Sequence, residues 1–414
     1  KISAQICGDS VTAAFGTSFD SAEGSVGIDI TVGCIDVGAQ VYSGKTYDSY
    51  GKTQLDFIFS DSRVSSSIIR VKGDVNVGGG LDIYSSSVLR IAADKMAVDG
   101  VVNMDLNGGS YSNILFQKAV VFEIGGLNAT SERNDFTICN TGGFSSGIVF
   151  KNAAGTDFMF IGNICDDGNS LQYHHDGVVN IAMDGAGTQR IFQSMFSTAS
   201  ECQYSARQRG TVSAKSGRLF MDNSRIAADY RLAALSLEGG RFGAGHYDSS
   251  QAGAAYFKSA NFQSGGLAYE NFANHNAVET QASDKIIITE TFSKAAGSGK
   301  ISVDFSDKDG NALNLSEYAV ADGVSGIENW VEILTAGSLD GFDLESKLGG
   351  NIYDANGDFY AVGIENGVAV FRWAESPESG YAPQVGFAQV PEPAAAAAVL
   401  GAIALGLAAR GRRR

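Results

Sequence analysis

Short runs in which apolar and polar residues alternate fill most of this chain, and each run is typical of a β-strand. In the first clear example Ile28, Ile30 and Val32 share one face, and the phase then slips so that Ile35 and Val37 continue the apolar side. A slip of one residue turns the inward face over, so it predicts a bend at residues 33–34. Similar runs predict strands at 69–77, 81–84, 101–106, 120–124, 148–150, 158–161 and 178–183, with clusters of glycine, asparagine, aspartate and serine between them.

Some of these runs are near copies of one another, which indicates a repeat. Residues 100–108 read GVVNMDLNG and residues 177–185 read GVVNIAMDG, while 73–77 hold a weaker copy, GDVNV. Segments at 147–150 and 210–212 echo the same start, and the steps between copies are roughly 25 to 35 residues or small multiples of that. Such a period is typical of a solenoid, in which one coil of short strands buries its apolar side chains only against the next coil.

We therefore predict an all-β fold in which a glycine-rich parallel β-helix or β-solenoid-like body occupies residues 1–277. The four prolines of the chain all fall within its last 38 residues. This agrees with the prediction, because proline removes a hydrogen-bond donor from any inner strand. The alternative is an antiparallel β-sandwich or barrel, whose strands are also separated by polar turns at short intervals.

A small β-rich terminal domain is predicted over residues 278–376. Its clearest signal is the pair of alternating runs 359–365 and 368–373, joined by Asn366-Gly367. Asn-Gly between two such runs predicts a β-hairpin with a type I′ turn. The domain would cap the last coil, whose open edge could otherwise pair with another chain. A linker, 377–390, follows.

The composition restricts the partners of the protein. The formal net charge of −16 disfavours nucleic acid, whose phosphates would be repelled, and suits a body outside the cell. Extracellular polysaccharide is a further candidate partner, attached through bridging cations. The five cysteines are too widely spaced for a zinc ribbon or a Cys-x-x-Cys pair, and both disulfides and buried thiols remain open.

The C-terminal tail has the pattern of a membrane-spanning helix. Residues from Ala394 to Ala409 include no polar side chain, and Arg410, Arg412, Arg413 and Arg414 follow. Sixteen helical residues measure about 24 Å, slightly less than the roughly 30 Å of the hydrocarbon core, so the span needs local thinning of the bilayer or snorkelling arginines. Because arginines stay on the cytoplasmic side, the body is predicted to be exported.

The residues before this span make the pattern specific. Pro391, Glu392 and Pro393, then the short Ala/Leu/Gly span and the terminal arginines, resemble the PEP-CTERM sorting signal of Gram-negative bacteria over about the last 25 residues. The resemblance implies recognition by an exosortase-type membrane protease and removal of the tail near Pro391, Glu392 and Pro393. It also implies a transient inner-membrane anchor with a cytoplasmic C-terminus, and delivery to the cell surface or extracellular matrix.

Candidate sites for chemistry are weak by comparison. Residues 165–167 and 174–176 read CDD and HHD, but adjacent strand residues face opposite sides, so a solvated loop is preferred to a metal site. The runs 307–311 and 354–358 resemble the start of calcium loops, but glycine stands fourth and not sixth, so they are interpreted as turns. No motif for a nucleophile, a zinc protease or a phosphate loop occurs. We predict no catalytic residue, no metal site and no cofactor.

The primary hypothesis is thus an exported structural or adhesive protein, a substrate of the sorting protease and not an enzyme. The alternative is a secreted carbohydrate-active enzyme, a polysaccharide lyase or hydrolase, on a β-helix with the same signal. Six arginines that could meet an acidic polymer are interpreted as outer-face residues of successive coils: Arg190, Arg207, Arg209, Arg218, Arg225 and Arg231. A groove that combines aspartates and arginines of adjacent coils would favour the enzyme.

Overall fold

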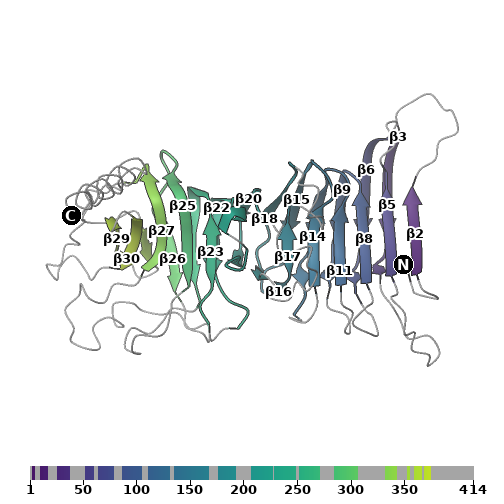
Figure 1. Cartoon of the computed structure of the whole chain (residues 1–414), viewed down its shortest axis with the longest axis horizontal. Coiled ribbons are helices and arrows are strands. Elements are labelled where there is room, and N and C mark those ends of the chain that lie inside the picture. The colour runs from purple at the N-terminus through teal and green to yellow at the C-terminus, as the bar shows by residue number, and fades with distance from the viewer. Residues whose placement is uncertain are drawn as a thin grey trace, which may run out of the picture.

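The computed structural model describes residues 2–4, 10–16, 26–37, 52–59, 64–78, 86–104, 111–130, 135–166, 176–192, 207–226, 228–248, 251–270, 284–305, 332–342, 352–354, 359–365 and 368–373. These residues form an all-β body, elongated along one axis, in which the strands stack along that axis (Figure 1). Besides the strands they include one short 3₁₀ helix, η1 (Ala228–Tyr230).

Two sheets occupy the N-terminal part of the body. The first consists of β1 (Ile2–Ala4), β4 (Ile35–Val37), β7 (Val75–Val77), β10 (Val102–Asn103) and β13 (Leu127–Asn128). The second consists of β2 (Ser10–Gly16), β5 (Lys52–Ile58), β8 (Ser86–Ala92), β11 (Tyr111–Phe116), β14 (Asp135–Asn140) and β17 (Asn163–Cys165).

The third sheet runs the length of the body. It opens with β3 (Val26–Val32), β6 (Val64–Val71), β9 (Lys95–Val98), β12 (Val121–Ile124), β15 (Ser145–Phe150), β18 (Val178–Met183) and β20 (Thr211–Ala214). A second series of strands consists of β16 (Asp157–Ile161), β19 (Thr188–Phe192) and β21 (Arg218–Asp222). The two series meet in the long strand β22 (Ala234–Ala244), whose first half pairs with β20 and whose second half pairs with β21.

Beyond β22 the sheet continues to the C-terminal end of the described residues. Its further strands are β23 (Ala254–Phe257), β24 (Ser259–Tyr269), β25 (Lys285–Lys294), β26 (Ile301–Phe305), β27 (Glu332–Asp340), β28 (Ile352–Asp354), β29 (Phe359–Glu365) and β30 (Val368–Trp373).

Parallel pairing dominates this architecture. From β1 to β18 each ladder joins strands three places apart in the chain, as β7 pairs with β10 and β8 pairs with β11. The pairings remain parallel as far as β27 and β28. The predicted stack of parallel strands is therefore confirmed for the described residues, and the antiparallel sandwich or barrel is wrong for them.

The core lies between the sheets and is continuous along the stack. Register partners place like side chains above one another: Val75, Val102 and Leu127 in the first sheet, Leu89, Ile114 and Ile138 in the second, and Met96, Phe122 and Ile148 in the third. All of these side chains are buried in one hydrophobic cluster. Each coil covers the apolar side chains of its neighbour, which a single coil cannot do alone.

The predicted bend is confirmed. Strand β3 ends at Val32 and β4 begins at Ile35. Ile35 and Val37 are buried, whereas Ile30 and Val32 are only partly buried against the core.

One interpretation of the repeat was wrong. Val75 and Val102 are register partners in the first sheet, as the copies at 73–77 and 100–108 predict. Strand β18, in the copy at 177–185, belongs to the third sheet, so this copy does not occupy the same position in its coil. Strands of different sheets share the same alternation and the same turn residues at their ends. Sequence similarity therefore did not reveal which sheet the strand joins.

The predicted hairpin is also confirmed, because β29 and β30 pair antiparallel with Glu365 opposite Val368. β30 pairs with β27 as well, and β29 with β28. Strand β25 pairs in parallel with β23, so the stacking continues across position 277, and a domain boundary there stays a prediction. The turn at 366–367, the linker 377–390 and the tail 391–414 lie outside the described residues. Within the described part of the chain there is no helix of the length and apolarity that a bilayer span requires.

Candidate functional site

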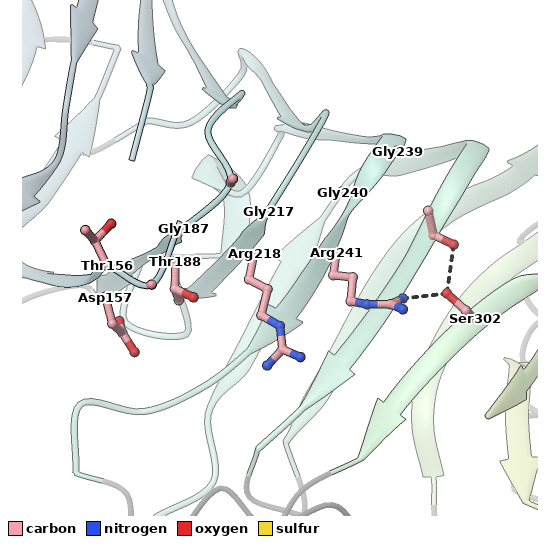
Figure 2. Close-up of a pocket in the computed structure, with 13 residues that line it drawn as sticks. Thr156, Asp157, Gly187, Thr188, Gly217, Arg218, Gly239, Gly240, Arg241 and Ser302 are labelled. Carbon is pink, nitrogen blue, oxygen red and sulfur yellow. Dashed lines mark hydrogen bonds between the residues drawn. The ribbon is translucent and has the colours of Figure 1, made fainter. Parts of the chain in front are cut away.

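A groove of about 560 Å³ crosses the outer surface of the third sheet (Figure 2). It extends over β16, β19, β21, β22, β24 and β26, and glycines form much of its wall. The lining residues are Gly155, Thr156, Asp157, Ala186, Gly187, Thr188, Gly217, Arg218, Gly239, Gly240, Arg241, Gly265 and Ser302.

The parallel register aligns residues from distant parts of the chain along this groove. Six successive register partners form one line: Asp157, Thr188, Arg218, Arg241, Gly266 and Ser302. Five strand spacings of about 4.8 Å make this line roughly 24 Å long. Polar side chains that lie far apart in the sequence therefore share one surface.

Glycine hollows the surface beside this line because the backbones pack too closely for a side chain. Gly217 has a φ of +56°, and a Cβ atom there would lie 2.3 Å from the carbonyl oxygen of Gly185 and 2.4 Å from that of Gly187. Gly265, with a φ of +96°, would place a Cβ atom 2.2 Å from the carbonyl oxygen of Gly240. These positions favour glycine both by conformation and by space.

Two arginines share one carboxylate at the end of the groove near β26. Nη2 of Arg218 donates to Asp304 at 3.2 Å, and Nε of Arg241 lies 2.6 Å from the same carboxylate oxygen. Arg241 also donates to the hydroxyl of Ser302, which donates to the carbonyl oxygen of Gly265 at 3.2 Å (Figure 2). Two cations against one anion leave a net positive charge at this end.

The end near β16 has the opposite balance. Arg190 donates to the two oxygens of Asp157 at 2.9 Å, through Nε and Nη2, and pairs with Glu270. Its guanidinium also lies over the ring of Phe220, 4.7 Å from the centroid. Burial lowers the pKa of Arg190, but the hydrogen bonds and charges of Glu270 and Asp157 outweigh it and raise that pKa above its ordinary value. Arg190 therefore stays protonated, and two carboxylates against one cation leave a net negative charge.

The structure brings together only part of the predicted arginine group. Arg218 lines the groove, and Arg190 pairs with Asp157, which also lines it. Arg225 and Arg231 instead stack on Tyr247 and Tyr256. Arg207 lies over the ring of Tyr230, and Arg209 pairs with Asp166.

Sequence reasoning missed Arg241, Asp157 and Asp304. A signal for Arg241 was present, because Arg218 follows Gly217 and Arg241 follows Gly240 in similar segments, SGRLF and GGRFG. The two aspartates had no such signal.

The candidate cluster at 165–176 has a structural role where it is described. Asp166 is 1% exposed and accepts hydrogen bonds from the backbone N–H groups of Val179 and Arg209, at 2.8 and 2.7 Å, and from Nε of Arg209. Burial raises the pKa of Asp166, and these hydrogen bonds offset that only in part. The carboxylate thus ties β18 to the segment before β20.

Other predicted positions lie outside the described residues: Asp167, His174 and His175, the run 307–311, and the sorting residues Pro391, Glu392, Pro393, Ala394, Ala409, Arg410, Arg412, Arg413 and Arg414. Among the residues that are described, no three His, Cys, Asp or Glu side chains are grouped to hold a metal ion.

No family model matches the chain, and no curated protein matches it either.

Proposed function

We propose that the protein is an exported structural or adhesive component of the cell surface or extracellular matrix. The observation that carries this proposal is the elongated stack of parallel strands with one continuous core. In our proposal this body is a parallel β-helix, with three strands per coil up to β18 and two strands per coil beyond it. The hairpin of β29 and β30 caps its last coil. Such a body is suited to extend from the cell and to present binding surfaces, because it has long outer faces on a rigid core.

The C-terminal tail provides the proposed sorting signal. In this proposal an exosortase-type protease recognises Pro391, Glu392 and Pro393 while the segment from Ala394 to Ala409 holds the chain in the inner membrane. The cluster from Arg410 to Arg414 keeps the C-terminus cytoplasmic. Processing then releases the body to the surface or matrix.

The test is the intact mass of the protein recovered from the surface or medium of its host. We expect the wild-type chain to lack the residues after about position 390, and Glu392→Ala to keep them and remain in the membrane. Glu378→Ala is the matched control, because Glu378 also follows a proline, Pro377, in the preceding linker. A full-length mass for all three proteins, held in the inner membrane, would refute the sorting proposal.

The groove favours a second candidate, the secreted carbohydrate-active enzyme. Asp157, Arg218 and Arg241 line the groove, and Asp304 pairs with both arginines. Such a combination of arginines and aspartates from successive coils is the one that distinguishes the enzyme from a featureless rod. Against it, both aspartates are ion-paired and the raised pKa of Arg190 disfavours a role as proton acceptor. Incubation with acidic and neutral polysaccharides, followed by measurement of new chain ends, tests it. Cleavage that is lost in Asp157→Asn or Asp304→Asn would establish the enzyme.

A further inference from the structure

We propose that the groove binds a single chain of an acidic polysaccharide, with a sugar carboxylate paired to Arg218 and Arg241. This inference rests on the proposed function, because a protein of the cell surface or extracellular matrix meets such a polymer there. It adds the chemical class of the ligand and the residues that select it.

The unequal pairing at Asp304 provides the charge. At other places on the body an exposed lysine pairs with one carboxylate, as Lys72 does with Asp99 and Lys151 with Asp184. Here two guanidinium groups share one carboxylate, and Arg218 remains 47% exposed. Arg218 donates one hydrogen bond to the protein out of the five N–H groups that it carries. A planar carboxylate fits the remaining donors in a bidentate pair.

The neighbouring residues of the groove suit a sugar. Arg218 and Arg241 project side by side from adjacent strands, with Thr188 next to them (Figure 2). Thr156, Thr188 and Ser302 supply hydroxyl groups, and the glycines leave room for a ring. Asp157, at the negative end, can accept a hydrogen bond from a sugar hydroxyl.

The spacing of the strands suits a polymer. Successive strands repeat about every 4.8 Å, which is close to the length of one sugar unit in an extended chain. A polysaccharide that runs parallel to the long axis of the body would therefore place about one sugar on each coil. The line from Asp157 to Ser302 provides several such positions in succession.

The overall charge of the protein opposes a polyanion, but distance limits that effect. The formal charge of the chain is −16. At physiological ionic strength the Debye length is about 8 Å, so exposed carboxylates farther away than this are largely screened at the groove. The contacts of Arg218 and Arg241 therefore decide the local interaction.

The experiment measures binding of a defined oligogalacturonate, an oligomer of uronic acids, to the full chain in detergent by isothermal titration calorimetry at physiological ionic strength. The comparison ligand is the same oligomer with its carboxylates reduced to alcohols. We expect Arg218→Gln and Arg241→Gln each to weaken binding roughly tenfold, as the loss of a charge-assisted hydrogen bond predicts. The reduced oligomer should bind the wild-type protein no better than it binds these variants.

Two further variants locate the effect. Arg70→Gln is the matched control, because Arg70 has a side chain 43% exposed and pairs with Asp29 away from the groove. It should bind like the wild type. Thr188→Trp fills the groove without a change of charge and should abolish binding. Thermal unfolding of every variant verifies that it is folded. A glutamine variant that is not folded is replaced by the lysine variant at the same position, such as Arg218→Lys or Arg241→Lys.

Three results would overturn the inference: equal binding of the reduced oligomer, an equal loss in Arg70→Gln, or unaltered binding by Thr188→Trp. The first would mean recognition of neutral sugars, the second non-specific attraction, and the third a site elsewhere. If the binding inference is refuted, the sorting proposal still stands provided that removal of the tail depends on Glu392. If the oligomer binds but the tail is not removed, the binding inference stands and the sorting proposal fails.

Discussion

At the scale of single residues, glycines with positive φ serve two different needs in this protein. Gly155 has a φ of +79°, and a Cβ atom there would meet nothing within 4 Å. Gly217 has a similar conformation, but a Cβ atom there would meet the backbone of the preceding coil. The first position therefore requires only the backbone conformation, and the second also requires the space.

This difference predicts unequal effects of alanine. Gly155→Ala should lower the free energy of unfolding by about 1–2 kcal/mol, the cost of a left-handed conformation with a Cβ atom. Gly217→Ala should cost roughly 1–3 kcal/mol more, because the coils must also move apart. Urea unfolding of the two variants and the wild type measures both values. Equal losses of free energy in the two variants would mean that the coils at Gly217 move apart without a measurable cost.

At the scale of strands, a line of polar side chains joins the coils of the first sheet. Asn76 donates to Asp36 at 2.7 Å, Asn103 donates to Asn76 at 3.0 Å, and Asn128 donates to Asn103 at 3.4 Å. Asn76 and Asn103 are 27 residues apart, and Asn103 and Asn128 are 25 apart. The side chains are half-buried, and their hydrogen bonds hold the register of β4, β7, β10 and β13.

The same strand pattern explains the misleading copy at 177–185. Asn180 occupies the place of Asn103 in that copy, but on the third sheet. Its amide nitrogen donates to the hydroxyl of Ser145 at 3.1 Å, and its amide oxygen accepts from the N–H of Thr211 at 2.8 Å. An outward asparagine that bonds the coils before and after it is thus used on two sheets.

The line of amides predicts a graded loss of stability. Asn103→Ala removes one hydrogen bond on each side and should lower the free energy of unfolding by about 1–2 kcal/mol. Asn128→Ala removes the single, longer bond to Asn103 and should cost less. Chemical denaturation of both variants provides the comparison, and an equal or greater loss in Asn128→Ala would contradict the role of the line.

At the scale of the whole molecule, stability is distributed along one dimension. Each coil packs on its neighbours, so a defect should affect nearby coils and leave distant ones unchanged. Phe122 is fully buried in β12, with its ring 5.8 Å from that of Phe116 in an edge-on contact. Val121, the next residue back, is 44% exposed on the opposite face.

Phe122→Ala should destabilise its region by about 3–5 kcal/mol, because it leaves a cavity between coils. Hydrogen exchange followed by mass spectrometry should show lost protection in β9, β12 and β15 and unchanged protection in β24 and β26. Val121→Ala is the control and should change little. Uniform loss of protection over the whole body would show that it unfolds as one unit.

The amino-acid sequence by itself determined the strand class, the bend before Ile35 and the hairpin of residues 359–373, because alternation and turn residues act over a few neighbouring positions. It also carries the proposed sorting signal, which is a linear motif. Only the tertiary structure decided which strands stack on one another and which side chains face the solvent. The segments between strands differ in length, so the register that aligns Asp157, Arg218, Arg241 and Ser302 depends on how each coil packs on the one before it. The groove is therefore a property of the stack, since no local stretch of sequence contains both of its charged ends.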